Sequence, residues 1–148
     1  MTGESRGESR NGEFRNGESE NGKSRKTRVL VIDDDHMVAD TLAEILRLHG
    51  FSPVALYSGE EAIEFVERFQ PDIVLSDIRM HGVDGIEAAK TIRQRHPECR
   101  VILFTASTVS SKTKQAIERS GFELLRRPLH PHSVLSALNQ PQREPTFE

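Results

Sequence analysis

Ile73-Val74-Leu75-Ser76-Asp77-Ile78-Arg79-Met80 is the stretch of this 148-residue chain that decides its fold. The stretch begins with three apolar residues, two of them β-branched, and after Ser76 the run ends on the carboxylate of Asp77. An apolar run this short is typical of a strand that is buried on both faces of a parallel sheet. In such sheets the reactive groups lie just beyond the carboxyl ends of the strands. Asp77 is therefore the first candidate for a functional residue.

The composition excludes several classes of function. The net charge is -3, so there is no basic field of the kind that binds nucleic acid. No run approaches the roughly 18 apolar residues of a membrane span, and the N-terminus lacks the apolar region of a secretory signal. The single cysteine, Cys99, cannot form an internal disulfide, which suits a reducing compartment. We therefore expect a cytoplasmic protein that binds neither nucleic acid nor membrane.

Residues 1–27 differ in composition from the rest of the chain. Glycine recurs at positions 3, 7, 12, 17 and 22, and Phe14 is the only bulky apolar residue after Met1. Such a segment buries too little apolar surface to offset the entropy of ordering it. We predict a disordered low-complexity tail, with a weak docking arm as the alternative. Residues 141–148 contain two prolines and are expected to fray, which leaves one domain at 28–140.

Apolar runs and helical periodicities alternate through that domain. Strands are predicted at 29–32, 54–56, 73–77, 100–104 and 122–125. Helices are predicted at 36–49, from 58 to 69, from 86 towards Pro97, at 110–120 and from Pro131 onward. This alternation predicts an α/β fold, a parallel sheet with helices on both faces and right-handed crossovers. The helix at 110–120 is expected to be loosely held, because only Ala116 and Ile117 in it are clearly apolar.

Five polar residues follow the predicted strands: Asp33, Asp34, Asp77, Thr105 and Arg127. Because the carboxyl ends of parallel strands share one edge, we expect these side chains to converge. Neighbouring carboxylates raise one another's pKa, and Mg²⁺, which prefers oxygen ligands, relieves the repulsion. Phosphoryl transfer needs a nucleophile, a metal and further donors. Asp77 can serve as the nucleophile, and Asp34, with Asp33 behind it, can hold the metal. The Thr105 hydroxyl and a cationic side chain can supply the further donors. The simpler alternative, that residues 33–35 only cap the next helix, fits Asp35 best.

Five spaced motifs carry a resemblance to a known family. They are Val29-Leu30-Val31-Ile32-Asp33-Asp34-Asp35, Leu75-Ser76-Asp77-Ile78-Arg79-Met80, Val83-Asp84-Gly85, Phe104-Thr105-Ala106 and Arg127-Pro128. Together, over about residues 28–140, they resemble the receiver domain of bacterial two-component response regulators. The resemblance implies a flavodoxin-like, doubly wound fold with five parallel strands in the order 2-1-3-4-5 and five helices.

The same resemblance implies a chemistry for the site. A sensor histidine kinase or a phosphotransfer protein would phosphorylate Asp77. Mg²⁺ would be held by Asp34, Asp77 and the main-chain carbonyl of Arg79, with Asp33 close by. Thr105 would turn toward the phosphoryl group and draw the following loop and helix with it.

Two positions depart from the family pattern. Arg127 stands where the family usually has Lys, and Leu124 stands where it usually has an aromatic switch residue. Arginine keeps the charge but is longer and planar, so it either reaches the phosphoryl group or weakens phosphorylation. Without an aromatic ring at Leu124, the signal would pass through the Thr105 loop and the helix after it. These departures keep a second reading open, a pseudo-receiver that binds proteins without using phosphate.

The expected output is contact with a downstream effector protein, since about eight residues follow the last predicted helix. The sequence leaves open whether the chain forms a homodimer through its fourth and fifth helices. We do not expect an enzyme. A hydrolase of the related phosphatase type would need a second Asp two residues after the nucleophile, where Arg79 stands.

Overall fold

The computed structural model describes residues 25–105, 108–125 and 130–141. Strands and helices alternate along the described chain, as predicted. In order they are β1 (Arg28–Ile32), α1 (His36–Leu48), β2 (Ser52–Leu56), α2 (Gly59–Phe69), β3 (Ile73–Asp77), α3 (Gly85–Arg95), β4 (Arg100–Phe104), α4 (Ser111–Arg119), β5 (Glu123–Leu125) and α5 (Pro131–Asn139).

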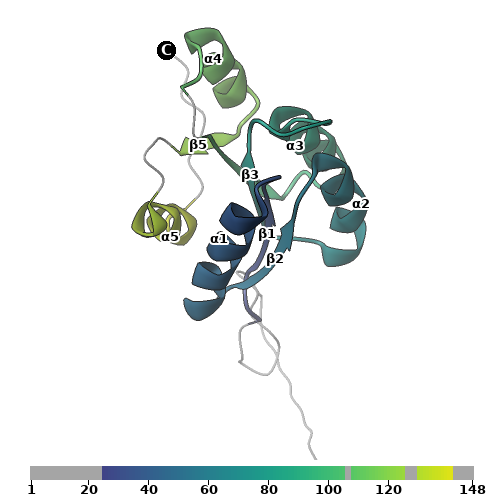
Figure 1. The fold of residues 1–148 in the computed structure, drawn as a ribbon. Helices are drawn as coiled ribbons and strands as arrows, with labels where there is room; N and C mark the ends of the chain where they lie inside the picture. The colour runs from purple at the N-terminus through teal and green to yellow at the C-terminus, as the bar shows by residue number, and fades with distance from the viewer. Residues whose placement is uncertain (1–24, 106–107, 126–129, 142–148) are drawn as a thin grey trace, which may run out of the picture.

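The strands form one sheet in the order β2-β1-β3-β4-β5 (Figure 1), and each neighbouring pair is parallel. The predicted strand order is therefore confirmed. Strand β2 lies at one edge, where Pro53 is tolerated because an edge strand has one side without a hydrogen-bonding neighbour. Strands β1 and β3 lie side by side at the centre, with Ile32 opposite Ser76. The residues that follow these two strands consequently lie at one edge of the sheet.

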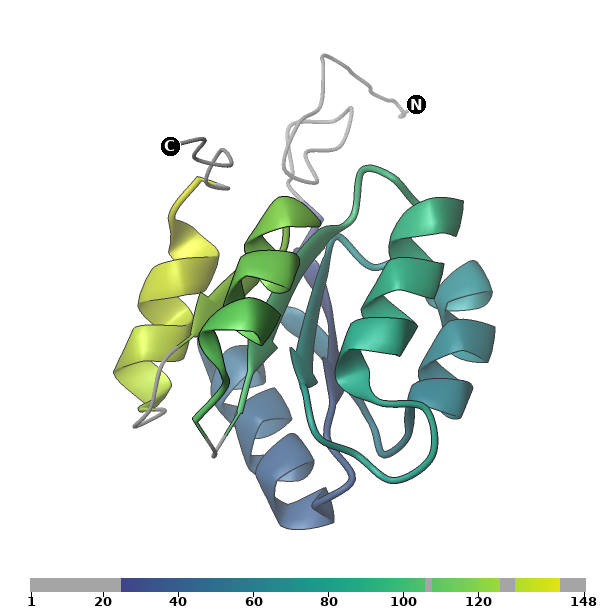
Figure 2. The ribbon, with the colours of Figure 1, turned by 90° about the horizontal axis from the view of Figure 1, so that it is seen from above.

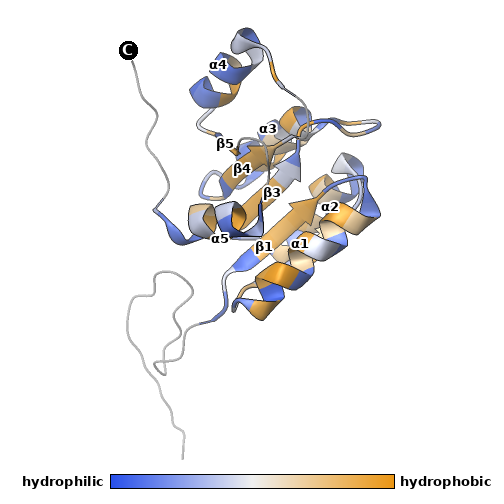
Figure 3. Ribbon diagram, turned by 60° about the vertical axis from the view of Figure 1, so that its left-hand side comes forward, coloured by the Kyte–Doolittle hydropathy of each residue, from blue (hydrophilic) through white to orange (hydrophobic). Residues whose placement is uncertain are grey.

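Two layers of helices cover the sheet because successive strand side chains point to opposite faces. Val29 and Val31 pack with α1 and α5, through residues such as Leu42 and Val134. Leu30 and Ile32 belong to the other apolar cluster, which the helices α2, α3 and α4 cover. Figure 2 shows the sheet passing between these layers, and Figure 3 shows its central strands as the most hydrophobic part of the fold.

Side-chain caps fix where the helices begin. Asp35 caps α1 by accepting hydrogen bonds from the amides of Met37 and Val38, as expected for this residue. Ser58 caps α2 by accepting from the amide of Glu61 at 3.1 Å. The carboxylate of Glu61 accepts in turn from the amide of Tyr57. In an ideal capping box the donor would be the amide of the cap residue itself, Ser58. These local signals were readable in the sequence because both partners lie within four residues.

Helix α4 buries little apolar surface against the domain. Ile117 is its one buried residue, whereas Ala116, which the sequence suggested as a second inward residue, is exposed. The helix therefore has one inward apolar residue where the sequence suggested two, which is consistent with the expectation that it is loosely held.

The described chain begins with three residues, 25–27, of the segment that we expected to be a tail. The guanidinium of Arg25 pairs with the carboxylate of Asp72 at 2.9 and 3.0 Å, and the carbonyl of Thr27 accepts from the amide of Ser52. Residues 1–24 and 142–148 lie outside the described residues, so the predicted tails remain predictions. None of the helices in the described ranges has the length and apolar character needed to cross a membrane.

Candidate functional site

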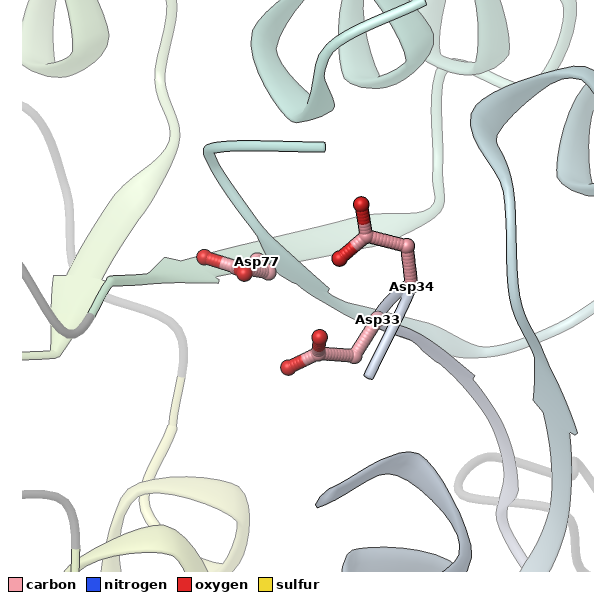
Figure 4. A group of neighbouring side chains, drawn as sticks. All are labelled: Asp33, Asp34 and Asp77. Carbon is pink, nitrogen blue, oxygen red and sulfur yellow. The ribbon is translucent and has the colours of Figure 1, made fainter. Parts of the chain in front are cut away.

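Three carboxylates meet at the carboxyl edge of the sheet. Asp33 and Asp34 directly follow β1, and Asp77 is the last residue of β3. One oxygen from each lies within 4.8 Å of the others. Figure 4 shows the three side chains converging from the ends of the two central strands. The structure therefore brings together the three aspartates that the sequence singled out.

Backbone contacts fix the position of Asp77. The amide of Ile78 donates to the carbonyl of Phe104, and the amide of Gly85 donates to the carbonyl of Ile78, both at 2.8 Å. A Cβ atom at Gly85 would lie 1.9 Å from the carbonyl oxygen of Asp77, so only glycine allows α3 to begin this close to β3. The amide of Arg79 donates to Oδ1 of Asp77 at 3.3 Å. The carboxylate is thus held by the loop that follows it.

The surroundings of the aspartates move their pKa values in different directions. Burial raises the pKa of Asp33 to about 6, against the hydrogen bond from the Asp35 amide and with help from the charges of Asp77 and Asp34. Burial also raises the pKa of Asp77, and the charge of Asp34 adds to it. The pKa of Asp34 is lowered, chiefly by the hydrogen bond from the main-chain amide of His81. The cluster therefore carries a concentrated negative charge at neutral pH, part of it desolvated.

His81 is the member of this site that the sequence did not reveal. Its amide nitrogen and its ring Nδ1 both contact Oδ2 of Asp34, at 3.0 and 2.7 Å. The two residues are 47 positions apart in the chain, and one histidine in a loop carries no motif. Only the folded position of the β3–α3 loop makes the contact visible.

The donor set fits a hard divalent cation. All three side chains offer carboxylate oxygens, and burial, together with the neighbouring negative charges, raises the pKa values of Asp33 and Asp77. Mg²⁺ takes oxygen ligands, retains several waters and needs only one or two carboxylates from the protein. The residues present could therefore hold Mg²⁺.

The remaining predicted site residues divide into two groups. Thr105 is buried and directly follows Phe104, which is paired with Asp77 in the sheet register, so it lies at the same edge. Arg127 and the Arg127-Pro128 peptide lie outside the described residues, and their roles stay predictions. Leu124 lies in β5 and packs against the apolar cluster beneath α2, α3 and α4.

Comparison with known proteins identifies the class. Residues 29–139 match the response regulator receiver domain, so the chain belongs to this family, and its fold is the flavodoxin-like fold that the resemblance implied. The chain is 32% identical over 114 residues to the chemotaxis protein CheY of Bacillus subtilis (strain 168). The aligned residues cover 76% of this chain and 95% of that protein.

A longer relative agrees with this assignment, and a solved structure agrees with the fold. The DNA-binding transcriptional regulator NtrC of Klebsiella pneumoniae is 36% identical over 98 residues, which is 66% of this chain and 21% of NtrC. The chain thus spans about a fifth of the length of that relative. The structure of the Vibrio cholerae chemotaxis protein CheY4 has a TM-score of 0.71 at 24% identity, covering 77% of this chain and 97% of that one. This structural likeness supports the fold.

Proposed function

We propose that this protein is a phosphoacceptor response regulator, phosphorylated on Asp77 by a sensor histidine kinase or a phosphotransfer protein. The observation that carries the proposal is the convergence of Asp33, Asp34 and Asp77 within 4.8 Å at the ends of the two central strands of a receiver domain. In the reaction an oxygen of Asp77 forms a bond to phosphorus while the bond from phosphorus to the donor histidine nitrogen breaks.

The other residues of the site have supporting roles. Asp34 and Asp77, with Asp33 close by and the main-chain carbonyl of Arg79, would hold Mg²⁺, which neutralises charge on the phosphoryl oxygens when bound. The Arg79 amide, which already donates to the Asp77 carboxylate, keeps that side chain in place. We assign to the Thr105 hydroxyl and the Arg127 guanidinium the further donors that the transferred group requires.

The output that we propose is contact with an effector protein, in the cytoplasm and without catalysis of a separate reaction. The loop after Thr105 leads into α4, which a single buried residue holds to the domain. Little apolar burial opposes a shift of this helix when Thr105 moves. A homodimer, if one forms, would use α4 and α5.

A pseudo-receiver that binds its partner without phosphate is the second candidate. It is favoured by Arg127 in place of the usual lysine and by Leu124, whose side chain packs on the apolar cluster instead of acting as an aromatic switch.

Incubation with acetyl phosphate and MgCl₂, followed by intact-mass spectrometry, separates the two candidates. Wild type should gain one phosphoryl group and Asp77→Asn none. Asp84→Asn is the matched control, because Asp84 lies in the neighbouring loop as the cap of α3 and asparagine caps equally well. Thermal unfolding of each variant checks that it is folded. The absence of a mass gain on wild type would favour the pseudo-receiver.

A further inference from the structure

Both donors of His81 converge on a single oxygen of Asp34. The main-chain amide and ring Nδ1 contact Oδ2, at 3.0 and 2.7 Å, and no bond between His81 and Oδ1 accompanies them. Figure 4 shows that one oxygen of Asp34 is turned toward Asp33 and Asp77 while the other is turned away from them. Two donors on one oxygen fix the rotation of the whole carboxylate group.

The loop that carries His81 is itself anchored to α2. The amide of Val83 donates to Oε2 of Glu60 at 3.2 Å. Between the two contacts, a Cβ atom at Gly82 would lie 2.6 Å from the same Glu60 oxygen, so the loop lies directly against this carboxylate. The side chain of His81 is fully exposed, so apolar packing does not account for its place beside Asp34. The contact with Asp34 does account for it.

We propose that His81 is a positioning residue of the magnesium site, which holds Oδ2 of Asp34 and thereby fixes how the carboxylate is turned beside Asp33 and Asp77. This inference rests on the magnesium site of the proposed function and deepens it. Carboxylates that bind metals are commonly held by an outer hydrogen bond, and loss of such a partner typically weakens metal affinity by about 10–100-fold. The ring donates to Asp34 either as the imidazolium or as the neutral tautomer that carries its proton on Nδ1.

Titration of the metal-free, full-length protein with MgCl₂, followed by amide NMR shifts, tests the proposal without phosphorylation. His81→Ala should weaken Mg²⁺ binding by about tenfold, since the ring donor is lost while the main-chain amide remains. His81→Asn should keep most of the wild-type affinity that His81→Ala loses, because the asparagine side-chain amide places a donor close to the position of Nδ1. His49→Ala is the control, an exposed histidine at the other end of α1 whose Nδ1 contacts the carbonyl of Ile45. Melting temperatures in EDTA should agree among all four proteins.

The outcomes separate this inference from the function on which it rests. If wild type binds Mg²⁺ and His81→Ala binds it equally well, or His81→Asn fails to restore binding, the positioning role is wrong. Tighter binding by His81→Ala would show that His81 competes with the metal for Asp34, which also overturns it. If wild type binds no Mg²⁺, the magnesium site of the proposed function fails first.

Discussion

Gly85 allows helix α3 to begin against the end of strand β3. A side chain there would meet the backbone carbonyl of Asp77 at 1.9 Å, and backbone cannot turn aside as a flexible side chain can. Gly85→Ala should therefore lower the free energy of unfolding by about 1–3 kcal/mol and displace Asp77, which weakens Mg²⁺ binding. Urea unfolding and a Mg²⁺ titration measure the two effects. Gly50→Ala is the control: its φ of 93° costs stability, but no atom lies within 4 Å of the added carbon, and Mg²⁺ binding should not change. Equal effects of both variants on Mg²⁺ binding would contradict the prediction.

Asp33 makes the stability of the metal-free protein fall as pH rises. Its pKa is about 6 in the folded state against 3.8 for an ordinary aspartate, so between these values the folded state binds more protons than the unfolded state. The penalty is absent below about pH 4 and complete above about pH 6, and amounts to at most about 3 kcal/mol. Asp33→Asn should remove this penalty, because asparagine carries no charge. Its side-chain oxygen can still accept the hydrogen bond that the Asp35 amide gives to Oδ1. In urea unfolding with EDTA, the variant should be more stable than wild type at pH 7 and equal to it near pH 4. If the difference in the free energy of unfolding between the variant and wild type does not change with pH, the charge of Asp33 is not its cause.

Arg100 joins three elements at the end of the sheet opposite the aspartates. From the start of β4 its guanidinium pairs with Glu123 of β5 at 2.7 and 2.9 Å. It also donates to the carbonyls of Ala137 and Gln140 at the end of α5. Arg100→Met leaves a largely buried carboxylate unpaired, and we expect a loss of about 3–5 kcal/mol in the free energy of unfolding. Arg95→Met is the control, since its pair with Glu67 is half-exposed at 3.6 Å and should contribute less than about 1 kcal/mol. Urea unfolding of both variants checks this, and similar losses would refute the assignment.

The elements that the sequence predicted well are those whose cause is local. Apolar runs marked the strands, and Asp35 and Ser58 marked the starts of two helices, because a cap and its amide are neighbours in the chain. Convergence of the aspartates followed from parallel topology alone. Arg100 and His81 were missed because their partners lie 23 and 47 residues away. A charged residue at the start of a strand or in a loop is ordinarily solvated, so its sequence position carries no signal of these contacts.

The two ends of the sheet differ in how their charges are arranged. At the amino end of the sheet, charges are paired: Asp72 with Arg25, and Arg100 with Glu123. At the carboxyl end, Asp33 and Asp77 lose hydration by burial and lie beside like charges, and both effects raise the pKa of the two carboxyl groups. The fold therefore concentrates a destabilising charge where a cation and a phosphoryl group would be used, and gains stability elsewhere. Functional sites commonly show this division.

Mg²⁺ should consequently stabilise the whole domain. The folded chain holds three carboxylates within 4.8 Å, whereas the unfolded chain separates Asp34 from Asp77 along its length, so the ion binds the folded state preferentially. At ten times its dissociation constant the ion adds about 1.4 kcal/mol, which corresponds to a rise of roughly 5–10 °C in the melting temperature of a domain this size. The measurement is thermal unfolding over a MgCl₂ series at constant ionic strength. Asp77→Asn relieves the repulsion, so it should melt above wild type in EDTA and gain less from Mg²⁺. Asp72→Asn, at the paired end, should keep the full Mg²⁺ response, and an equal response in Asp77→Asn would mean that the ion acts somewhere other than this cluster.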